Sequence, residues 1–232
     1  MWKIDEAVKN NTYGLKKEQY VYRDAPLQFS KKVPTKWKMK FQKNTEVSQL
    51  SLVMRAIMDN QESEILKKFA SQFIGELIQK FIDVIDDCSM EDLHYVPVGT
   101  GNHIGFLAWH VMRSIDNVIF FAFDREKPIW LQKKYNELMD LPKIDQGTDY
   151  SSEEANQLII HEKEHLINYC KDLAKAIDEK ILNVDDHYLF EINKVVPWGE
   201  IPRIESIGKM MIAHGNEHLG EAQAILSITK NK

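Results

Sequence analysis

Apolar residues recur at intervals of three and four along most of the chain, which is the repeat of an amphipathic α-helix. The clearest series runs from Ile65 to Ile85 and predicts a long helix over about residues 62–88. The same pattern predicts further helices over residues 103–124, 151–181 and 204–227. Four long helices joined by loops are typical of a four-helix bundle, so we predict an all-α fold.

The segments between these helices contain residues that cap or interrupt helices. Residues 97–102 are turn-prone, and Asn102 is placed to cap the helix that follows. Ser151 precedes Glu154 by three positions, which is the spacing of a capping box. Residues 185–202 combine strand-forming residues with Pro and Gly, and we predict a loop or a hairpin there.

The first 45 residues differ from the rest of the chain in both pattern and charge. They contain 11 Lys and Arg against 4 Asp and Glu, or +7, whereas residues 46–232 contain 19 against 31, or −12, which together give the net charge of −5. They are rich in aromatic residues, and the strict alternation over residues 36–41 predicts a short strand. We interpret residues 1–45 as an irregular basic extension and residues 46–232 as the helical domain.

A basic extension on an acidic domain raises the question of a nucleic-acid partner. The extension contains no recognisable nucleic-acid-binding motif, so we expect no such partner. The simpler interpretation is that it docks on its own acidic domain. Its alternating apolar face is also compatible with a homodimer.

The composition is typical of a globular cytoplasmic protein. The 232 residues are 44% hydrophobic, which is enough for one substantial core. No apolar run approaches the roughly 18 residues of a membrane span, and the first residues do not read as a signal peptide, so we expect no membrane partner. With only 2 cysteines, a disulfide scaffold is excluded and a reducing cytoplasm is expected.

Three histidines in two of the predicted helices carry the candidate chemistry. His214 and His218 are four residues apart, so they differ by about 40° around a helix axis and by about 6 Å along it. Both imidazoles can therefore point at one ion. His110 lies in an apolar stretch of the second helix, where a buried imidazole needs a partner. Three nitrogen ligands would leave a coordination position open, as in catalytic metal sites.

A second pair of histidines competes with this site. Residues 161–165 read His-Glu-Lys-Glu-His, which matches the motif of zinc metalloproteases. In that motif His161 and His165 would bind zinc and Glu162 would activate water. The pattern is short, lies in a segment rich in Glu and Lys, and lacks the further ligand motifs that follow it in such enzymes. We keep the metalloprotease as a minor alternative to a solvated helix edge.

Several stretches of the chain resemble the DinB-like superfamily of metal-binding bundles. Residues 101–116 are similar to its second helix, and residues 213–221 are similar to its final helix. Residues 127–130 and 145–154 resemble parts of one DinB-like branch. The order and separation of these motifs are more specific than any one of them, and the resemblance covers about residues 60–229.

The resemblance implies a four-helix bundle that holds one divalent metal ion. In this superfamily one histidine of the second helix and two of the fourth bind the metal, and these correspond to His110, His214 and His218. Zinc is the first expectation, with nickel or iron as alternatives for three imidazoles. Characterised relatives include bacillithiol transferases and mycothiol-dependent maleylpyruvate isomerases. The resemblance therefore implies a low-molecular-weight thiol and an electrophile as substrates.

Three other residues lie close to the predicted ligands in sequence. Glu221 follows His218 by three and can orient that ligand or act as a base on a metal-bound water, the alternative being an ordinary solvated glutamate. Arg113 follows His110 by three and is a candidate for an anionic substrate group, the alternative being a salt bridge to a neighbouring helix. His103 lies roughly 10 Å from His110 along the helix, so we place it at the mouth of the site.

We predict a metal-dependent enzyme, either an S-transferase that activates a thiol or a hydrolase that activates water. The alternative from a different class is a non-catalytic metal-binding or stress-related interaction protein. In that case the basic extension would recruit the partner.

Overall fold

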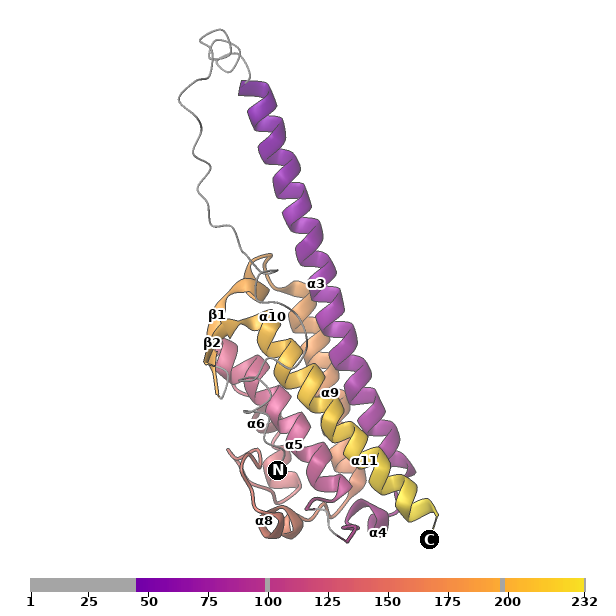
Figure 1. Cartoon of the computed structure of the whole chain (residues 1–232). Helices are drawn as coiled ribbons and strands as arrows, with labels where there is room; N and C mark the ends of the chain where they lie inside the picture. The colour runs from indigo at the N-terminus through magenta and orange to yellow at the C-terminus, as the bar shows by residue number, and fades with distance from the viewer. Residues whose placement is uncertain (1–44, 99–100, 197–198, 232) are drawn as a thin grey trace, which may run out of the picture. The chain divides into compact units, whose positions relative to one another are not determined.

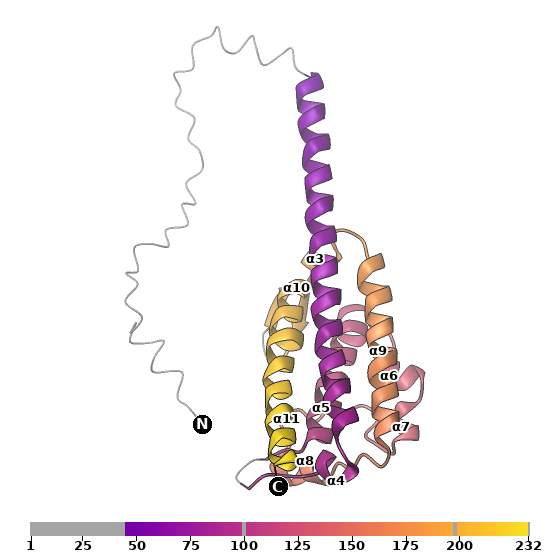
Figure 2. The ribbon, with the colours of Figure 1, turned by 90° about the vertical axis from the view of Figure 1, so that its right-hand side faces the viewer.

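The computed structural model describes the backbone of residues 45–98, 101–196 and 199–231, and the side chains from Asn60 onward. The chain divides into two units after residue 51, and the bundle lies in the second unit, Leu52–Lys232. Four long helices run side by side in it (Figures 1 and 2): the part of α3 (Thr45–Asp87) from Leu52 onward, α5 (Ile104–Asp116), α9 (Lys163–Asn183) and α11 (His214–Lys230). The predicted all-α bundle is confirmed. The predicted extension and its strand lie outside the described residues. They stay predictions, and so does the homodimer that was inferred from them.

Short elements connect the long helices. Those between α3 and α9 are α4 (Met90–Leu93), the π-helical η3 (Asn117–Ala122), α6 (Ile129–Gln132), α7 (Tyr135–Leu138) and α8 (Ser152–Gln157). Those before α11 are the 3-10 helix η4 (Tyr188–Phe190), strands β1 (Ile192–Val195) and β2 (Gly199–Pro202), α10 (Arg203–Ser206) and the π-helical η5 (Ile207–Ala213). The two strands are antiparallel, with Asn193 opposite Ile201, so the predicted hairpin is confirmed.

Helix α5 is surrounded by protein. All 13 of its residues are buried, and its sequence is apolar on nearly every side, which is expected of a helix with no solvent face. Asp116 at its end accepts hydrogen bonds from the backbone N–H groups of Ile129 and Trp130 and from the Tyr169 hydroxyl, each at 2.8 Å. This buried carboxylate therefore ties α6 and α9 to α5.

Helix α5 begins one residue later than predicted, and its N-cap is His103 instead of Asn102. The Nδ1 atom of His103 accepts a hydrogen bond from the backbone N–H of Phe106 at 3.1 Å. The side chain is 1% exposed, and burial lowers its pKa to about 4, so the ring stays neutral and able to accept. The prediction that His103 lines the mouth of the site is therefore wrong.

The third predicted helix is broken in two. The capping box of Ser151 and Glu154 is present, but it starts α8, which ends at Gln157, and α9 begins only at Lys163. Between them Leu158 and Ile160 are buried and Ile159 is exposed, an alternation that belongs to extended chain. Three consecutive apolar residues fit a helix or an extended segment equally well, so the sequence pattern did not reveal the break.

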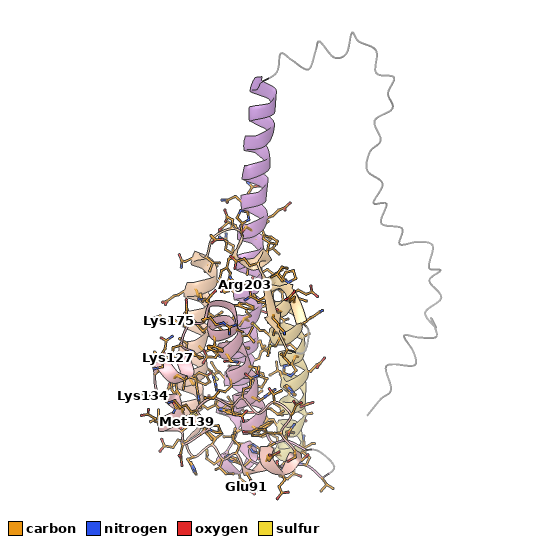
Figure 3. The ribbon with its side chains drawn as sticks, turned by 90° about the vertical axis from the view of Figure 1, so that its left-hand side faces the viewer. Glu91, Lys127, Lys134, Met139, Lys175 and Arg203 are labelled. Carbon is orange, nitrogen blue, oxygen red and sulfur yellow. The ribbon has the colours of Figure 1, made fainter. Side chains whose placement is uncertain are left out.

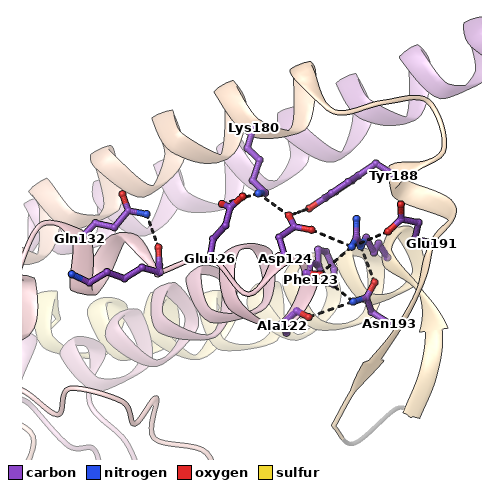
Figure 4. A network of polar contacts seen from close by, with 11 residues as sticks. Ala122, Phe123, Asp124, Glu126, Gln132, Lys180, Tyr188, Glu191 and Asn193 are labelled. Atoms are coloured by element: carbon purple, nitrogen blue, oxygen red, sulfur yellow. Dashed lines mark hydrogen bonds and ion pairs between the residues drawn. The ribbon is translucent and has the colours of Figure 1, made fainter.

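A polar network fastens the hairpin to the bundle at the start of the last helix (Figure 4). The guanidinium of Arg203 donates to Asn193 Oδ1 at 2.7 Å and to the Phe123 carbonyl at 3.0 Å, and it pairs with Asp124 at 3.1 Å. The Tyr188 ring packs beneath it at 4.0 Å. Arg203 and Glu91 lie at opposite ends of the bundle in Figure 3. The network thus fixes one end of the helical run that leads to His214.

None of the helices in the described part of the chain combines the length and the apolar character that crossing a bilayer requires.

Candidate metal centre

The three predicted histidines converge from α5 and α11. The ring of His110 lies 5.4 Å from that of His214 and 5.3 Å from that of His218, centroid to centroid. The Nε2 atoms of His214 and His218 are 3.1 Å apart. One ligand nitrogen from each residue lies within 4.8 Å of the other two. Among the described residues, no other group of three histidines, cysteines or carboxylates meets in this way.

Two of the rings, those of His110 and His218, are oriented by contacts at Nδ1, the nitrogen that faces away from the other histidines. The Nδ1 atom of His110 lies 2.6 Å from the backbone carbonyl of Gln146, and Nδ1 of His218 lies 3.0 Å from Oε2 of Glu221. Both acceptors require a proton on Nδ1, which leaves the Nε2 lone pair free. Hydrogen bonds of this kind orient histidine ligands in metal sites. Glu221 therefore lies where the sequence predicted a residue that orients His218.

A π-helical turn places the third ring, His214. The backbone N–H of His214 donates to the carbonyls of Lys209 and Met211, and so not to that of Met210, its partner in a regular α-helix. The Nδ1 atom makes no hydrogen bond of good geometry among the described residues, yet the Met210 carbonyl is close enough to favour a proton on the ring. The backbone pairing therefore departs from the α-helical pattern at the ligand itself.

Burial keeps the rings of His110 and His214 neutral. Burial lowers the pKa of His110 to about 4, and burial together with the neighbouring His218 lowers the pKa of His214. Neutral imidazole is the form that binds a metal ion. The hydrogen bond with His218 lowers the pKa of Glu221, so this carboxylate is ionised at neutral pH. The donor set of three imidazole nitrogens fits a divalent metal ion.

The loop that holds His110 is itself locked against α5. Gly147 has a φ of +78°, and a Cβ atom there would lie 2.9 Å from the ring of Phe106. Oδ1 of Asp145 accepts hydrogen bonds from the backbone N–H groups of Gln146 at 2.7 Å and of Gly147 at 3.0 Å. These contacts aim the Gln146 carbonyl at His110. Sequence reasoning missed Gln146 because it acts through its backbone, although the Asp-Gln-Gly turn marked the loop.

A glycine next to the ligand pair brings α11 close to α3. A Cβ atom on Gly215 would lie 2.5 Å from a methyl carbon of Leu77. A larger residue there would require the buried Leu77 side chain or the helices to shift. The close packing sets the distance between α11 and the rest of the bundle, and with it the position of His214 and His218.

Arg113 does not face the histidines. Its side chain is buried, donates to the Ile144 carbonyl at 3.2 Å and lies 3.6 Å from Asp116 and 5.1 Å from the Trp130 ring centre. A guanidinium enclosed in the core cannot receive a substrate anion without rearrangement, so this placement contradicts the predicted anion-binding role. The salt-bridge alternative fits, except that the carboxylate belongs to the same helix.

The competing pair of histidines lacks the metalloprotease geometry. His161 and Glu162 precede the start of α9, and only His165 lies within the helix. Glu162 pairs with His165 at 3.3 Å. Two histidines bind one zinc ion in that motif because both lie on one face of a helix. This segment therefore does not support the metalloprotease alternative.

The fold and the site define an all-α bundle with a three-histidine centre between two of its helices. The family model of the DinB superfamily matches residues 75–222, more than half of the chain. The chain belongs to the DinB superfamily. A solved structure described as the conserved protein of locus from Enterococcus faecalis has a TM-score of 0.61 and 18% identity, covering 71% of this chain and 97% of that one. At this identity the likeness concerns the fold. No curated protein shows a significant match.

Proposed function

We propose that the protein is a metal-dependent enzyme that activates a low-molecular-weight thiol for attack on an electrophile. The observation that carries this proposal is the convergence of three imidazoles, with the Nδ1 atoms of His110 and His218 each within hydrogen-bond distance of an acceptor. Membership of the DinB superfamily supports a metal ion at this place.

The donor set guides the choice of metal and chemistry. Three imidazole nitrogens suit zinc, nickel or iron, and we propose zinc. When bound, a divalent ion with three neutral ligands supplies Lewis-acid chemistry that brings the pKa of a thiol or a water towards neutrality. Hydrolysis is the second candidate. A water and a thiol could each bind an ion held by the same three histidines, so the ligand set is compatible with both reactions.

Residues around the centre hold protons and orient the ligands. The Gln146 carbonyl keeps the proton of His110 on Nδ1, and the Glu221 carboxylate does the same for His218. Because that hydrogen bond lowers the pKa of Glu221, its carboxylate is a poor proton acceptor. We therefore assign Glu221 a positioning role and not the role of a general base.

Metal content tests the first half of the proposal. We expect elemental analysis to find about one equivalent of metal in the wild type, as one site of this kind binds one ion. His110→Ala should lose that metal, and the exposed control His161→Ala should retain it. Metal lost from His161→Ala and retained by His110→Ala would overturn the site.

Turnover tests the second half. Purified metal-loaded protein should accelerate the reaction of a small thiol with a chromogenic aryl halide, and His218→Ala should abolish the acceleration. Hydrolysis of an ester without any thiol reaction would favour the second candidate. Metal binding with neither activity would favour a non-catalytic metal-binding protein.

A further inference from the structure

A cavity of about 350 Å³ lies beside the histidine centre, between the loop that precedes α5 and the C-terminal half of α11. Leu107 of α5 supplies one apolar wall. Ala224, Ile225 and Ile228 of α11 supply another. The volume falls within the range of small-molecule sites, about 300–1,000 Å³.

Glu221 joins this cavity to the histidines. The same side chain that lines the cavity lies 3.0 Å from Nδ1 of His218 through its Oε2 atom. On the opposite wall, Leu107 precedes His110 by three residues, one turn earlier on α5. A molecule whose reacting end lies at the three imidazoles can therefore extend its other end into the cavity.

The lining selects the chemistry of the occupant. The described residues that line the cavity include one carboxylate, that of Glu221, and no Lys, Arg or His that could pair with an anion. An anionic group placed there would therefore meet no counter-charge from the lining. The side chain of Asn102, which also lines the cavity, has an amide NH2 group that can donate and an oxygen that can accept. At roughly 30 Å³ for each water-sized volume, the cavity holds about ten non-hydrogen atoms.

We infer that this cavity binds the uncharged alkyl or aryl part of the electrophile on which the histidine centre acts. The assignment of the occupant as the electrophile rests on the proposed function. Binding of an apolar group in the cavity needs no metal. An experiment can therefore refute the cavity proposal without refuting the metal-dependent function, and the reverse.

The test is a ¹⁹F NMR titration of the full-length protein with 4-fluorobenzyl alcohol, which carries an aryl ring and one hydroxyl. Ala224→Phe fills the cavity from an exposed helix position, so the fold should tolerate it. It should weaken binding by about tenfold or more. The control Gln223→Phe adds the same ring one position earlier, where the side chain faces Lys80 and Asp83 of α3. It should change binding by less than about twofold.

Two further arms fix the ligand class and separate the two proposals. The anion 4-fluorobenzoate should bind about tenfold more weakly than the alcohol. His110→Ala should bind the alcohol within about threefold of the wild type, because its change lies in the metal centre. Alcohol binding that Ala224→Phe leaves unchanged, or no binding by the wild type, overturns the inference even if metal is bound. If the wild-type protein binds the alcohol but elemental analysis finds no metal in it, the cavity is supported and the metal-dependent function is refuted.

Discussion

The buried histidine that caps α5 should make the fold sensitive to acid, and His103→Asn tests this. The Nδ1 atom of His103 accepts the Phe106 N–H, and an asparagine side chain can make the same N-cap bond. The substitution therefore keeps the cap and removes a titrating group. Its lost packing lowers the free energy of unfolding by an amount that does not depend on pH.

The size of the effect follows from the pKa of His103. Burial lowers that pKa from 6.5 to about 4, so the unfolded state takes up the proton first as the pH falls. The contribution of His103 to stability is complete above pH 6.5 and declines between pH 6.5 and 4. One linked proton changes the free energy of unfolding by about 1.4 kcal/mol per pH unit. Over about 2.5 units the loss approaches about 3 kcal/mol.

The assay is urea unfolding of the wild type and His103→Asn at several pH values from 7.5 to 4.5, with a chelator present. The difference in free energy of unfolding between the wild type and His103→Asn should be constant above pH 6.5. Below that pH it should narrow by about 1.4 kcal/mol per unit, because only the wild type carries this loss. His110 and the carboxylates titrate in both proteins and cancel. The exposed His187→Asn serves as the control.

A difference that stays constant down to pH 4.5 would refute the reasoning. It would mean that His103 takes up its proton equally well in the folded and unfolded states. Parallel behaviour of His187→Asn and His103→Asn would refute it in the same way, since the effect would then follow from removing any histidine.

Three further predictions concern the centre, its loop and the thiols. Glu221→Ala should weaken metal affinity about 10- to 100-fold, and Glu221→Gln much less, because an amide oxygen still accepts from His218. Chelator competition measures both affinities. Equal metal affinities of Glu221→Ala and the wild type would contradict the positioning role. Gly147→Ala should lower the free energy of unfolding by about 1–3 kcal/mol, since its φ is +78° and a Cβ would meet an aromatic ring; an unchanged urea midpoint would contradict this. Burial raises the pKa of Cys88 to about 11 and of Cys170 to about 12, so Ellman's reagent should label both only after unfolding. Rapid labelling of the folded protein would contradict that expectation.

The spacing of apolar residues was sufficient to predict the helices that build the bundle. It predicts the helical runs of residues 104–124 and 203–230 within a few residues of their bounds, because burial of one face imposes a repeat that a single sequence displays. It starts the third helix at Ser151, whereas α9 begins only at Lys163. The four-residue spacing of His214 and His218 also predicted that the two rings share a face. The identity of their partner, His110, came from resemblance, since spacing within one helix says nothing about the helix opposite.

Tertiary structure alone decided the features that depend on remote partners. Ile160 lies in extended chain because its N–H bonds Nε2 of His94, 66 positions earlier, at 2.9 Å. Gln146 orients His110 from 36 positions away through a backbone carbonyl, which any residue type carries. Arg113 belongs to the core because of what packs around it. The sequence by itself determined which residues can meet, since helical geometry is local. Packing decided which atoms do meet, since hydrogen-bond partners and backbone turns depend on contacts between distant segments.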